Sequence, residues 1–333
     1  MKKFLNKPEA IMDETMRGYA QVNRHKIHLP EGTHNMMRRE PKKKGLVKLV
    51  VGNGGGHEPG LMGWIGRGMY DLDCLGNFFS AQSGTVFYEG IKSIDDGSPI
   101  LLTISNHAGD VMNGNLAYSL CVEDDMEIAK VLFYDDIATA PKGQEEERRG
   151  GAGMLFSIKM AGALAENGGS LEECVRVWNK ARDNTRTLSI ALGSWTHPVT
   201  GEVMASTPED LANIGAGVHG EAGPASMKFD TSANMMAKMC DMLVGDLPFE
   251  NGDEIIVLIN GAGATSMMEM SIVAQDIEKY LSSKGIKVWD SVAGNFVTTQ
   301  EMTGLSLSFL KLDHELKQLW LEPCSTPAYT NMK

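Results

Sequence analysis

The stretch LVKLVVGNGGGHEPG at residues 46–60 joins an apolar run to a glycine-rich turn that carries a histidine. The run at 46–51 has the length and β-branched content of a buried strand, and the glycines end it. Consecutive glycines leave backbone N–H groups accessible, and ligands of open α/β sheets gather at the carboxyl ends of strands. The turn therefore indicates either a site for a small polar ligand beside His57 or a plain strand-to-loop connection.

Short apolar runs of strand length recur along the chain and alternate with helical patterns, which is typical of α/β layers. The predicted strands are residues 46–51, 100–104, 128–134, 188–192, 255–259, 286–289 and 305–312. Met154, Ile158, Ala161 and Leu164 share one helical face. The fold class that follows is α/β, with two α/β domains, each a mixed or mostly parallel sheet flanked by helices.

The domain boundary is only weakly marked, because the composition changes little along the chain. At 333 residues the length favours two domains. We place an N-terminal α/β domain with the glycine-rich turn at 1–188 and a C-terminal α/β domain with a second histidine loop at 189–333. Ser170 and Ser266 each precede a glutamate by three residues, a spacing that predicts a capping box at a helix start. Residues 144–149, rich in charge, are predicted to lie on the surface.

The composition excludes several classes of protein. With 31 Lys plus Arg against 43 Asp plus Glu, the net charge of −12 argues against nucleic-acid binding. The five cysteines form no CxxC pair, which predicts neither a zinc site nor a disulfide framework. No apolar stretch is long enough for a signal peptide or a membrane helix, so we expect a cytoplasmic protein without membrane contact. Neither a GxGxxG fingerprint nor a P-loop is present, and we expect no nucleotide and no metal on this chain.

Two further turns carry residues suited to catalysis. The predicted strand at 100–104 runs into SNHAGD at 105–110, where Asp110 is either a helix N-cap, which its position alone favours, or an acceptor of a hydroxyl proton. Its strand end should share an edge of the sheet with the glycine-rich turn. The second loop, IGAGVHGEAG at 214–223, surrounds His219 with small residues. Such access suits a nucleophilic imidazole, although a lone loop histidine is more often structural.

Together these segments resemble the substrate-binding subunit of the dihydroxyacetone kinases (glycerone kinases, DhaK-like). The resemblance covers roughly residues 1–325 and rests on several motifs in a fixed order. Beyond the three turns, these are GIK at 90–92, RRGGAG at 148–153, LINGAG at 258–263 with Met268 and Glu269, MTGLSL at 302–307 and LKLD at 310–313.

The resemblance implies a role for each turn. His219 would form a hemiaminal with the carbonyl carbon of a short ketose, and His57 and Asp110 would handle protons around it. The backbone of Gly54, Gly55 and Gly56 would hold the substrate. The phosphoryl donor would lie on a separate helical subunit that carries ADP or ATP with magnesium, fuelled by ATP exchange or by a phosphotransferase-system protein. A homodimer is also implied.

Three departures from the family pattern bear on the substrate. Ser105 stands where the family usually has a lysine, His107 where it has a tyrosine, and Asn53 where it has glycine. The stretch GSWTHP at 193–198 is bulkier than usual. We therefore expect dihydroxyacetone or a four-carbon ketose such as erythrulose as the substrate bound with the help of Ser105. The alternative is a ketose-sensing co-activator of a transcription regulator, which would need only the histidine that traps the carbonyl.

Overall fold

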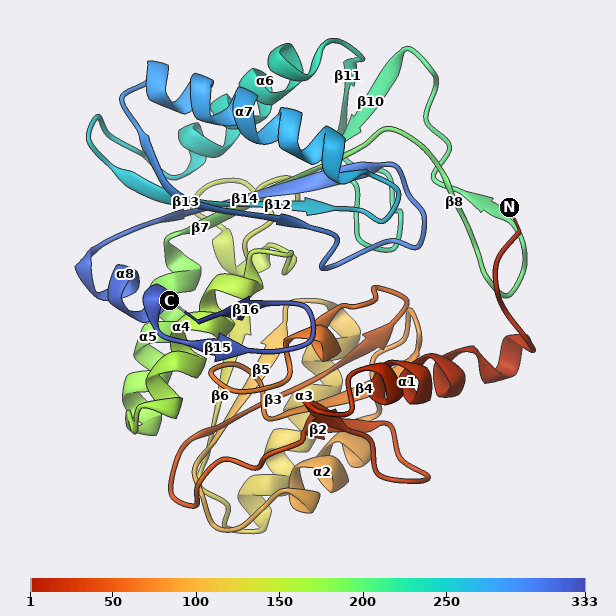
Figure 1. Ribbon diagram of the computed structural model, residues 1–333, viewed down its shortest axis with the longest axis vertical. Coiled ribbons are helices and arrows are strands. Elements are labelled where there is room, and N and C mark those ends of the chain that lie inside the picture. Colours follow the sequence, from red (N-terminus) through yellow and green to blue (C-terminus); the bar gives the residue numbers. More distant parts are fainter. Residues whose placement is uncertain (1, 333) are drawn as a thin grey trace. The chain divides into compact units, whose positions relative to one another are not determined.

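The computed structural model describes residues 2–332 and divides them into two compact α/β units (Figure 1). The Gly-turn unit contains residues 2–133, 157–181 and 315–332. The His-loop unit contains residues 134–156 and 182–314. The predicted α/β class is confirmed. The units are not contiguous in sequence, and the boundary predicted at 188/189 falls inside a strand of the His-loop unit.

The Gly-turn unit is built on a six-stranded sheet in the order β1-β2-β4-β3-β5-β6. The strands are β1 (Ile27–His28), β2 (Asn35–Arg38), β3 (Lys48–Gly55), β4 (Leu72–Phe78), β5 (Ile100–Ser105) and β6 (Ile128–Phe133). β4, β3, β5 and β6 run parallel, whereas β1 and β2 add an antiparallel edge. Because the four parallel strands point the same way, their carboxyl ends line one edge of the sheet.

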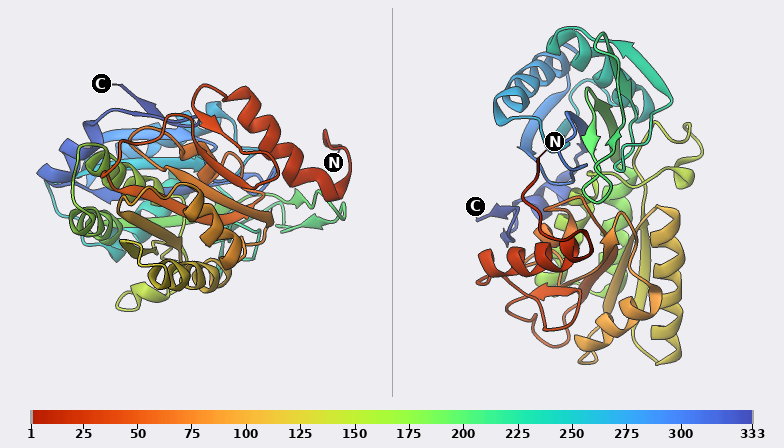
Figure 2. Two further views of the ribbon diagram at one scale, coloured as in Figure 1. Left: turned by 90° about the horizontal axis from the view of Figure 1, so that it is seen from below. Right: turned by 90° about the vertical axis from the view of Figure 1, so that its right-hand side faces the viewer.

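Helices cover both faces of this sheet. α2 (Gly84–Ser93) and α3 (Ala108–Glu123) pack side by side on one face, and α1 (Ile11–Val22) lies on the other (Figure 2). Gly52 explains the close approach of α2, because a Cβ there would lie 2.7 Å from the Phe87 ring. The remaining elements are η1 (Pro8–Ala10), η2 (Leu61–Trp64), α5 (Leu171–Asp183), α8 (His314–Leu321), β15 (Cys324–Ser325) and β16 (Thr330–Asn331).

The His-loop unit contains a second six-stranded sheet, in the order β11-β10-β7-β14-β12-β13. Only the β12–β13 pair is parallel. The strands are β7 (Thr185–Ala191), β10 (Leu211–Ile214), β11 (Ala225–Lys228), β12 (Glu254–Gly261), β13 (Lys287–Gly294) and β14 (Gly304–Lys311). α6 (Ser232–Asp246) and α7 (Met267–Ser283) lie together on one face (Figure 1). The remaining elements are η3 (Glu145–Glu147), β8 (Trp195–Thr196) and β9 (Val203–Met204), while α4 (Met154–Glu166) continues from this unit into the Gly-turn unit.

All seven predicted strands are present, within a few residues at their ends. Both capping boxes are confirmed: Ser170 and Glu173 exchange side-chain to backbone hydrogen bonds at 2.8 and 3.2 Å, and Ser266 does the same with Glu269. β4 was not predicted, because its Asp73, Gly76 and Asn77 disfavour a strand by composition. It forms because it lies between β2 and β3, which supply its hydrogen-bond partners.

Two expectations about polar and sulfur-bearing side chains have clear outcomes. The five cysteines are buried thiols, and none of them forms a disulfide among residues 2–332. The surface placement of residues 144–149 is wrong for Arg148, which is wholly buried. Its guanidinium can be buried because Asp246 neutralises it through two hydrogen bonds of 2.8 and 2.7 Å.

Within the described part of the chain, no helix is long and apolar enough to cross a membrane.

Asp246 neutralises two buried arginines, since Arg186 Nε also donates to its carboxylate. Burial alone would raise the pKa of Asp246, but hydrogen bonds from Arg148 and Arg186 outweigh burial and lower it. Asp246→Ala removes the counter-charge and should lower the free energy of unfolding by about 3–5 kcal/mol at pH 7.

Because the pKa is lowered in the folded state, this stabilisation is complete above the unfolded value of about 4 and is lost as pH falls through the folded value. Urea unfolding at pH 7 and pH 3 measures it, and the difference in stability between the two proteins should be smaller at pH 3 than at pH 7. Asp241→Ala is the control, because Asp241 is 62% exposed and its contacts with Lys284, 3.6 Å away, and with the Tyr280 hydroxyl lie at the surface. Equal effects of the two substitutions would contradict the expectation.

Candidate functional site

The glycine-rich turn packs too closely for side chains at its three central positions. A Cβ at Gly54 would lie 2.9 Å from the Ser80 nitrogen, one at Gly55 would lie 1.9 Å from Met12 Cε, and one at Gly56 would lie 2.5 Å from the Phe79 ring. Gly56 also has a φ of +102°, which favours glycine. Its N–H donates to Glu58 Oε1 at 2.8 Å. The sequence suggested that this amide is open to a ligand, and the structure shows that it is not.

His57 follows the turn and stacks on Phe79, with ring centroids 4.9 Å apart and planes inclined by 16°. Phe79 is held by its own N–H, which donates to the Gly55 carbonyl at 2.8 Å. The stacking fixes the plane of the imidazole relative to the turn. Phe79 was missed by the sequence analysis, because its contact with His57 depends on the chain returning through β4.

Ser105 and Asp110 lie at the same edge of the sheet as the glycine-rich turn. β3 and β5 are adjacent and parallel, with Val51 paired to Thr103, so their carboxyl ends are neighbours as predicted. The helix-cap interpretation of Asp110 is wrong: His107 is the N-cap of α3, and Asp110 is the third helical residue. Position N3 still places its charge in the first turn, where the helix dipole favours a carboxylate.

A second carboxyl group, Asp73 on β4, lies under this edge and was missed by the sequence analysis. Asn53 Nδ2 donates to Asp73 Oδ1 at 2.7 Å. Burial raises the pKa of Asp73, the hydrogen bond from Asn53 opposes it, and the charge of Asp110 adds to it, giving a value of about 8. The charges of Asp73 and Asp110 are therefore close enough to interact.

His219 lies in the His-loop unit, in the loop that joins β10 to β11. The loop closes on itself, because Gly217 N–H donates to the Glu221 carbonyl and Gly220 N–H to the Gly217 carbonyl, both at 2.9 Å. Thr299 Oγ1 donates to the Val218 carbonyl at 2.6 Å and anchors the loop to the connection between β13 and β14. Gly220 has a φ of +83°, and a Cβ there would lie 2.1 Å from Trp195 Nε1. The His219 side chain remains 32% exposed.

Glu221 orients the His219 ring. Its Oε1 lies 3.2 Å from His219 Nδ1, and its Oε2 accepts the His219 backbone N–H at 3.0 Å. Burial would raise the pKa of Glu221, but hydrogen bonds and the charge of His219 outweigh it and lower the pKa to about 2. Glu221 is therefore ionised at neutral pH, and its carboxylate accepts a hydrogen bond from Nδ1–H of His219. In the neutral ring this places the lone pair on Nε2.

Arg149 holds the other side of Glu221. Its Nη1 lies 4.0 Å from Glu221 Oε1, and its Nη2 donates to Asp136 at 3.0 Å and to the Gly215 carbonyl at 3.2 Å. The sequence placed Arg149 in a family motif without a role. Its position links Asp136, beyond β6, to the base of the histidine loop.

The sites fall into two groups. Gly54, Gly55, Gly56, His57, Ser105 and Asp110 belong to the Gly-turn unit, and His219 belongs to the His-loop unit. No group of three or more His, Cys, Asp or Glu side chains suited to a metal ion occurs among residues 2–332.

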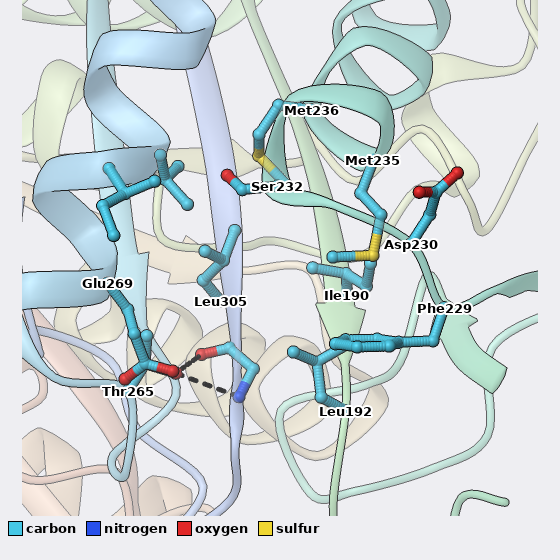
Figure 3. A pocket seen from close by; sticks show the side chains of 13 residues that line it. Ile190, Leu192, Phe229, Asp230, Ser232, Met235, Met236, Thr265, Glu269 and Leu305 are labelled. Atoms are coloured by element: carbon cyan, nitrogen blue, oxygen red, sulfur yellow. Dashed lines mark hydrogen bonds between the residues drawn. The ribbon is translucent and has the colours of Figure 1, made fainter. Parts of the chain in front are cut away.

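An apolar pocket of about 180 Å³ lies in the His-loop unit between the sheet and helices α6 and α7. Met235, Met236 and Leu305 line it, and none of the predicted site residues does (Figure 3). At the edge of the pocket, the Gly304 N–H donates a hydrogen bond to Thr265 Oγ1 at 3.0 Å. The Ser232 hydroxyl is buried beside this pocket and has no hydrogen-bond partner among residues 2–332.

Ser232→Ala should raise the free energy of unfolding by about 1 kcal/mol, because a buried hydroxyl without a partner is costly to desolvate. Chemical denaturation measures the change. Ser271→Ala is the matched helix control, since the Ser271 hydroxyl already donates to the Met267 carbonyl at 2.7 Å. A gain at position 232 no larger than that at 271 would contradict the explanation.

The fold and the two turns define a class of two-unit α/β proteins with a histidine in each unit's glycine-rich loop. The sequence profile of the Dak1 domain matches residues 17–328, and the chain belongs to this family. It is 35% identical over 330 residues to the "PTS-dependent dihydroxyacetone kinase 1, dihydroxyacetone-binding subunit DhaK" of Listeria innocua, covering 99% of both proteins.

Two longer relatives extend the comparison. The chain is 34% identical to the D-erythrulose kinase of Mycolicibacterium smegmatis over 99% of its own length and 56% of that protein. The crystal structure of the dihydroxyacetone kinase from C. freundii, in complex with AMP-PNP and Mg²⁺, superposes with a TM-score of 0.91 at 26% identity. That match covers 99% of this chain and 61% of the other. The chain thus spans little more than half of these two kinases.

Proposed function

We propose that this chain is the ketose-binding subunit of a multi-component kinase, and that it holds a short ketose covalently on His219. The observation that carries the proposal is the 3.2 Å contact between His219 Nδ1 and Glu221 Oε1. A carboxylate on Nδ1 directs the lone pair to Nε2 and stabilises the positive charge that develops when Nε2 attacks.

The reaction at His219 is an addition. Nε2 forms a bond to the carbonyl carbon of the ketose, the C=O π pair moves to oxygen, and that oxygen takes up a proton. The ring loses a proton overall, so the product is a neutral hemiaminal that contains every atom of the ketose. Glu221 pairs with the ring while it is cationic. Covalent attachment also fixes the terminal hydroxyl, which lowers the entropic part of the barrier to phosphoryl transfer.

The residues of the Gly-turn unit take the proton-transfer roles. Asp110 accepts the proton of the terminal hydroxyl as this oxygen attacks phosphorus, and His57, held flat on Phe79, donates to the oxygen of the former carbonyl. The backbone of Gly54, Gly55 and Gly56 contacts the substrate through groups other than the Gly56 N–H, which donates to Glu58. Ser105 offers a hydroxyl to a substrate oxygen, which suits dihydroxyacetone or a four-carbon ketose such as erythrulose.

The phosphoryl group comes from a partner in this proposal. A helical subunit that holds ADP or ATP with magnesium supplies it, and a phosphotransferase-system protein is a candidate source of that subunit's phosphate. The Listeria relative, named as PTS-dependent, supports this assignment, as does the absence of a P-loop from the sequence. We also propose a homodimer acting in the cytoplasm.

His219→Ala should abolish the covalent adduct. Intact-protein mass spectrometry of the wild-type chain with dihydroxyacetone or erythrulose should show a gain equal to the full mass of the ketose, without loss of water. His197→Ala is the matched control, because His197 lies in the same unit and its Nδ1 accepts from the Val199 and Thr200 amides. An adduct that persists in His219→Ala would reject the assigned nucleophile.

Glu221→Ala should weaken ketose binding by about 10- to 100-fold, the size expected for losing a hydrogen bond to a charged group. Because the pKa of Glu221 is about 2, this carboxylate stays ionised from pH 5 to pH 9, and no loss of its contribution at pH 5 should come from protonation of Glu221. Titration of ketose against the adduct signal measures both effects. Glu202→Gln, on an exposed carboxylate of the same unit, should leave binding unchanged. An effect of Glu221→Ala confined to low pH would contradict the role.

The co-activator alternative is tested by turnover. Ser105 and His107 favour this alternative, because they stand where the family usually has a lysine and a tyrosine. The ammonium and phenol groups of those residues are therefore absent from this edge of the sheet. Purified chain should phosphorylate dihydroxyacetone or erythrulose only when a nucleotide-bearing kinase subunit is added. Adduct formation without turnover, with Asp110 intact, would favour the sensor. Activity of the chain with ATP alone would reject the need for a partner.

A further inference from the structure

Asp73 is a wholly enclosed carboxyl group in the Gly-turn unit, and the proposed reaction does not use it. It lies on β4, paired with Val51 of the parallel neighbour β3, and its exposed fraction is 0%. Asn53, two residues beyond Val51, begins the glycine-rich turn. Asp73 therefore lies beside β3, two residues before the glycine-rich turn begins.

The two oxygens of Asp73 have different surroundings. Oδ1 accepts the 2.7 Å hydrogen bond from Asn53 Nδ2, whereas Oδ2 is buried and has no hydrogen-bond partner among residues 2–332. A carboxylate oxygen without a donor is costly to bury. A neutral acid with its proton on Oδ2 avoids that cost and still accepts from Asn53 through Oδ1.

The electrostatic surroundings favour the same form. The charged group that acts on Asp73 is Asp110, in the first turn of α3. The other titratable groups coupled to it are Tyr70, whose hydroxyl lies 2.7 Å from Thr103 Oγ1, and Cys74; both are buried. Neither carries a positive charge. Burial and Asp110 together outweigh Asn53 and place the pKa of Asp73 near 8.

We propose that Asp73 is a positioning residue of the Gly-turn site: uncharged, it fastens Asn53 and keeps a second negative charge away from Asp110. The proposal rests on the function proposed for Asp110. When Asp73 ionises, it adds a buried negative charge beside the carboxylate that must accept a proton, and next to the path of an anionic phosphoryl group. The site is therefore active while Asp73 is protonated and is switched off at alkaline pH.

The protonation of Asp73 can be measured by a titration that needs no activity assay. In the full chain labelled with ¹³C at aspartate carboxyl carbons, Asp73→Asn identifies the Asp73 signal, which should titrate near pH 8. Asp110→Asn should lower that midpoint, because it removes the repelling charge. Asn53→Gly should raise it, because it removes the donor to Oδ1. Shifts in opposite directions test the arrangement itself, whereas titration near the ordinary value of about 4 would overturn the proposal.

Folding stability gives an independent measurement. The folded pKa is raised, so the stability contributed by Asp73 is complete below about pH 4 and is lost as pH rises to about 8. Asp73→Asn keeps an acceptor for Asn53 and places an NH₂ group at the Oδ2 position, without titrating. Its urea midpoint should therefore vary less between pH 4 and pH 8 than that of the wild type. An identical pH dependence in the two proteins would overturn the proposal.

The effect on the site is measured by the pH profile of ketose phosphorylation with the partner subunit. Wild-type kcat/KM should fall about tenfold from pH 7 to pH 9, because one group with a pKa near 8 must stay protonated. In Asp73→Asn this alkaline fall should disappear. A fall of the same size in both would overturn the role of Asp73. If no ketose adduct forms on the wild-type chain, the proposed function is rejected instead. The titration of the Asp73 carboxyl group would still test the arrangement of Asp73, Asn53 and Asp110.

Discussion

The hydrogen bond between His219 Nδ1 and Glu221 fixes the orientation of the imidazole in the histidine loop. An imidazole without a partner divides its proton between two nitrogens, whereas a fixed carboxylate on Nδ1 leaves the lone pair of the neutral ring on Nε2. Glu221 is in turn held by Arg149, and Arg149 by Asp136 and the Gly215 carbonyl. His219 is thus the exposed end of a chain of contacts that runs through Glu221 and Arg149 to Asp136.

In both units the glycines of the turns also allow neighbouring groups to pack closely against the backbone. At Gly54, Gly55 and Gly56 the space for a side chain is filled by Ser80, Met12 and Phe79, and at Gly217 it is filled by Glu221. The loops are therefore filled by neighbouring side chains and are held in place by contacts on several sides. This packing explains how glycine-rich segments present a histidine in a defined orientation.

Much of the fold could be predicted from the sequence, because strands and helix starts depend on local chemistry. The runs at 100–104 and 255–259 are strands, and Ser266 with Glu269 caps a helix as expected. β4 could not be predicted, since Asp73 and Gly76 argue against a strand until β2 and β3 enclose them. The buried Arg148 was missed for a similar reason: its partner Asp246 is 98 residues away in sequence.

The sequence by itself determined the α/β class and the three turns, and it singled out His57, Asp110 and His219, because apolar periodicity and glycine content are local properties. Only the tertiary structure decided the surroundings that set their chemistry. Glu221 is within reach of His219 from the same loop, but Arg149, Phe79 and Asp73 arrive from elsewhere along the chain. Burial and the field of neighbouring charges set a carboxyl's proton affinity, and both exist only after the strands have assembled.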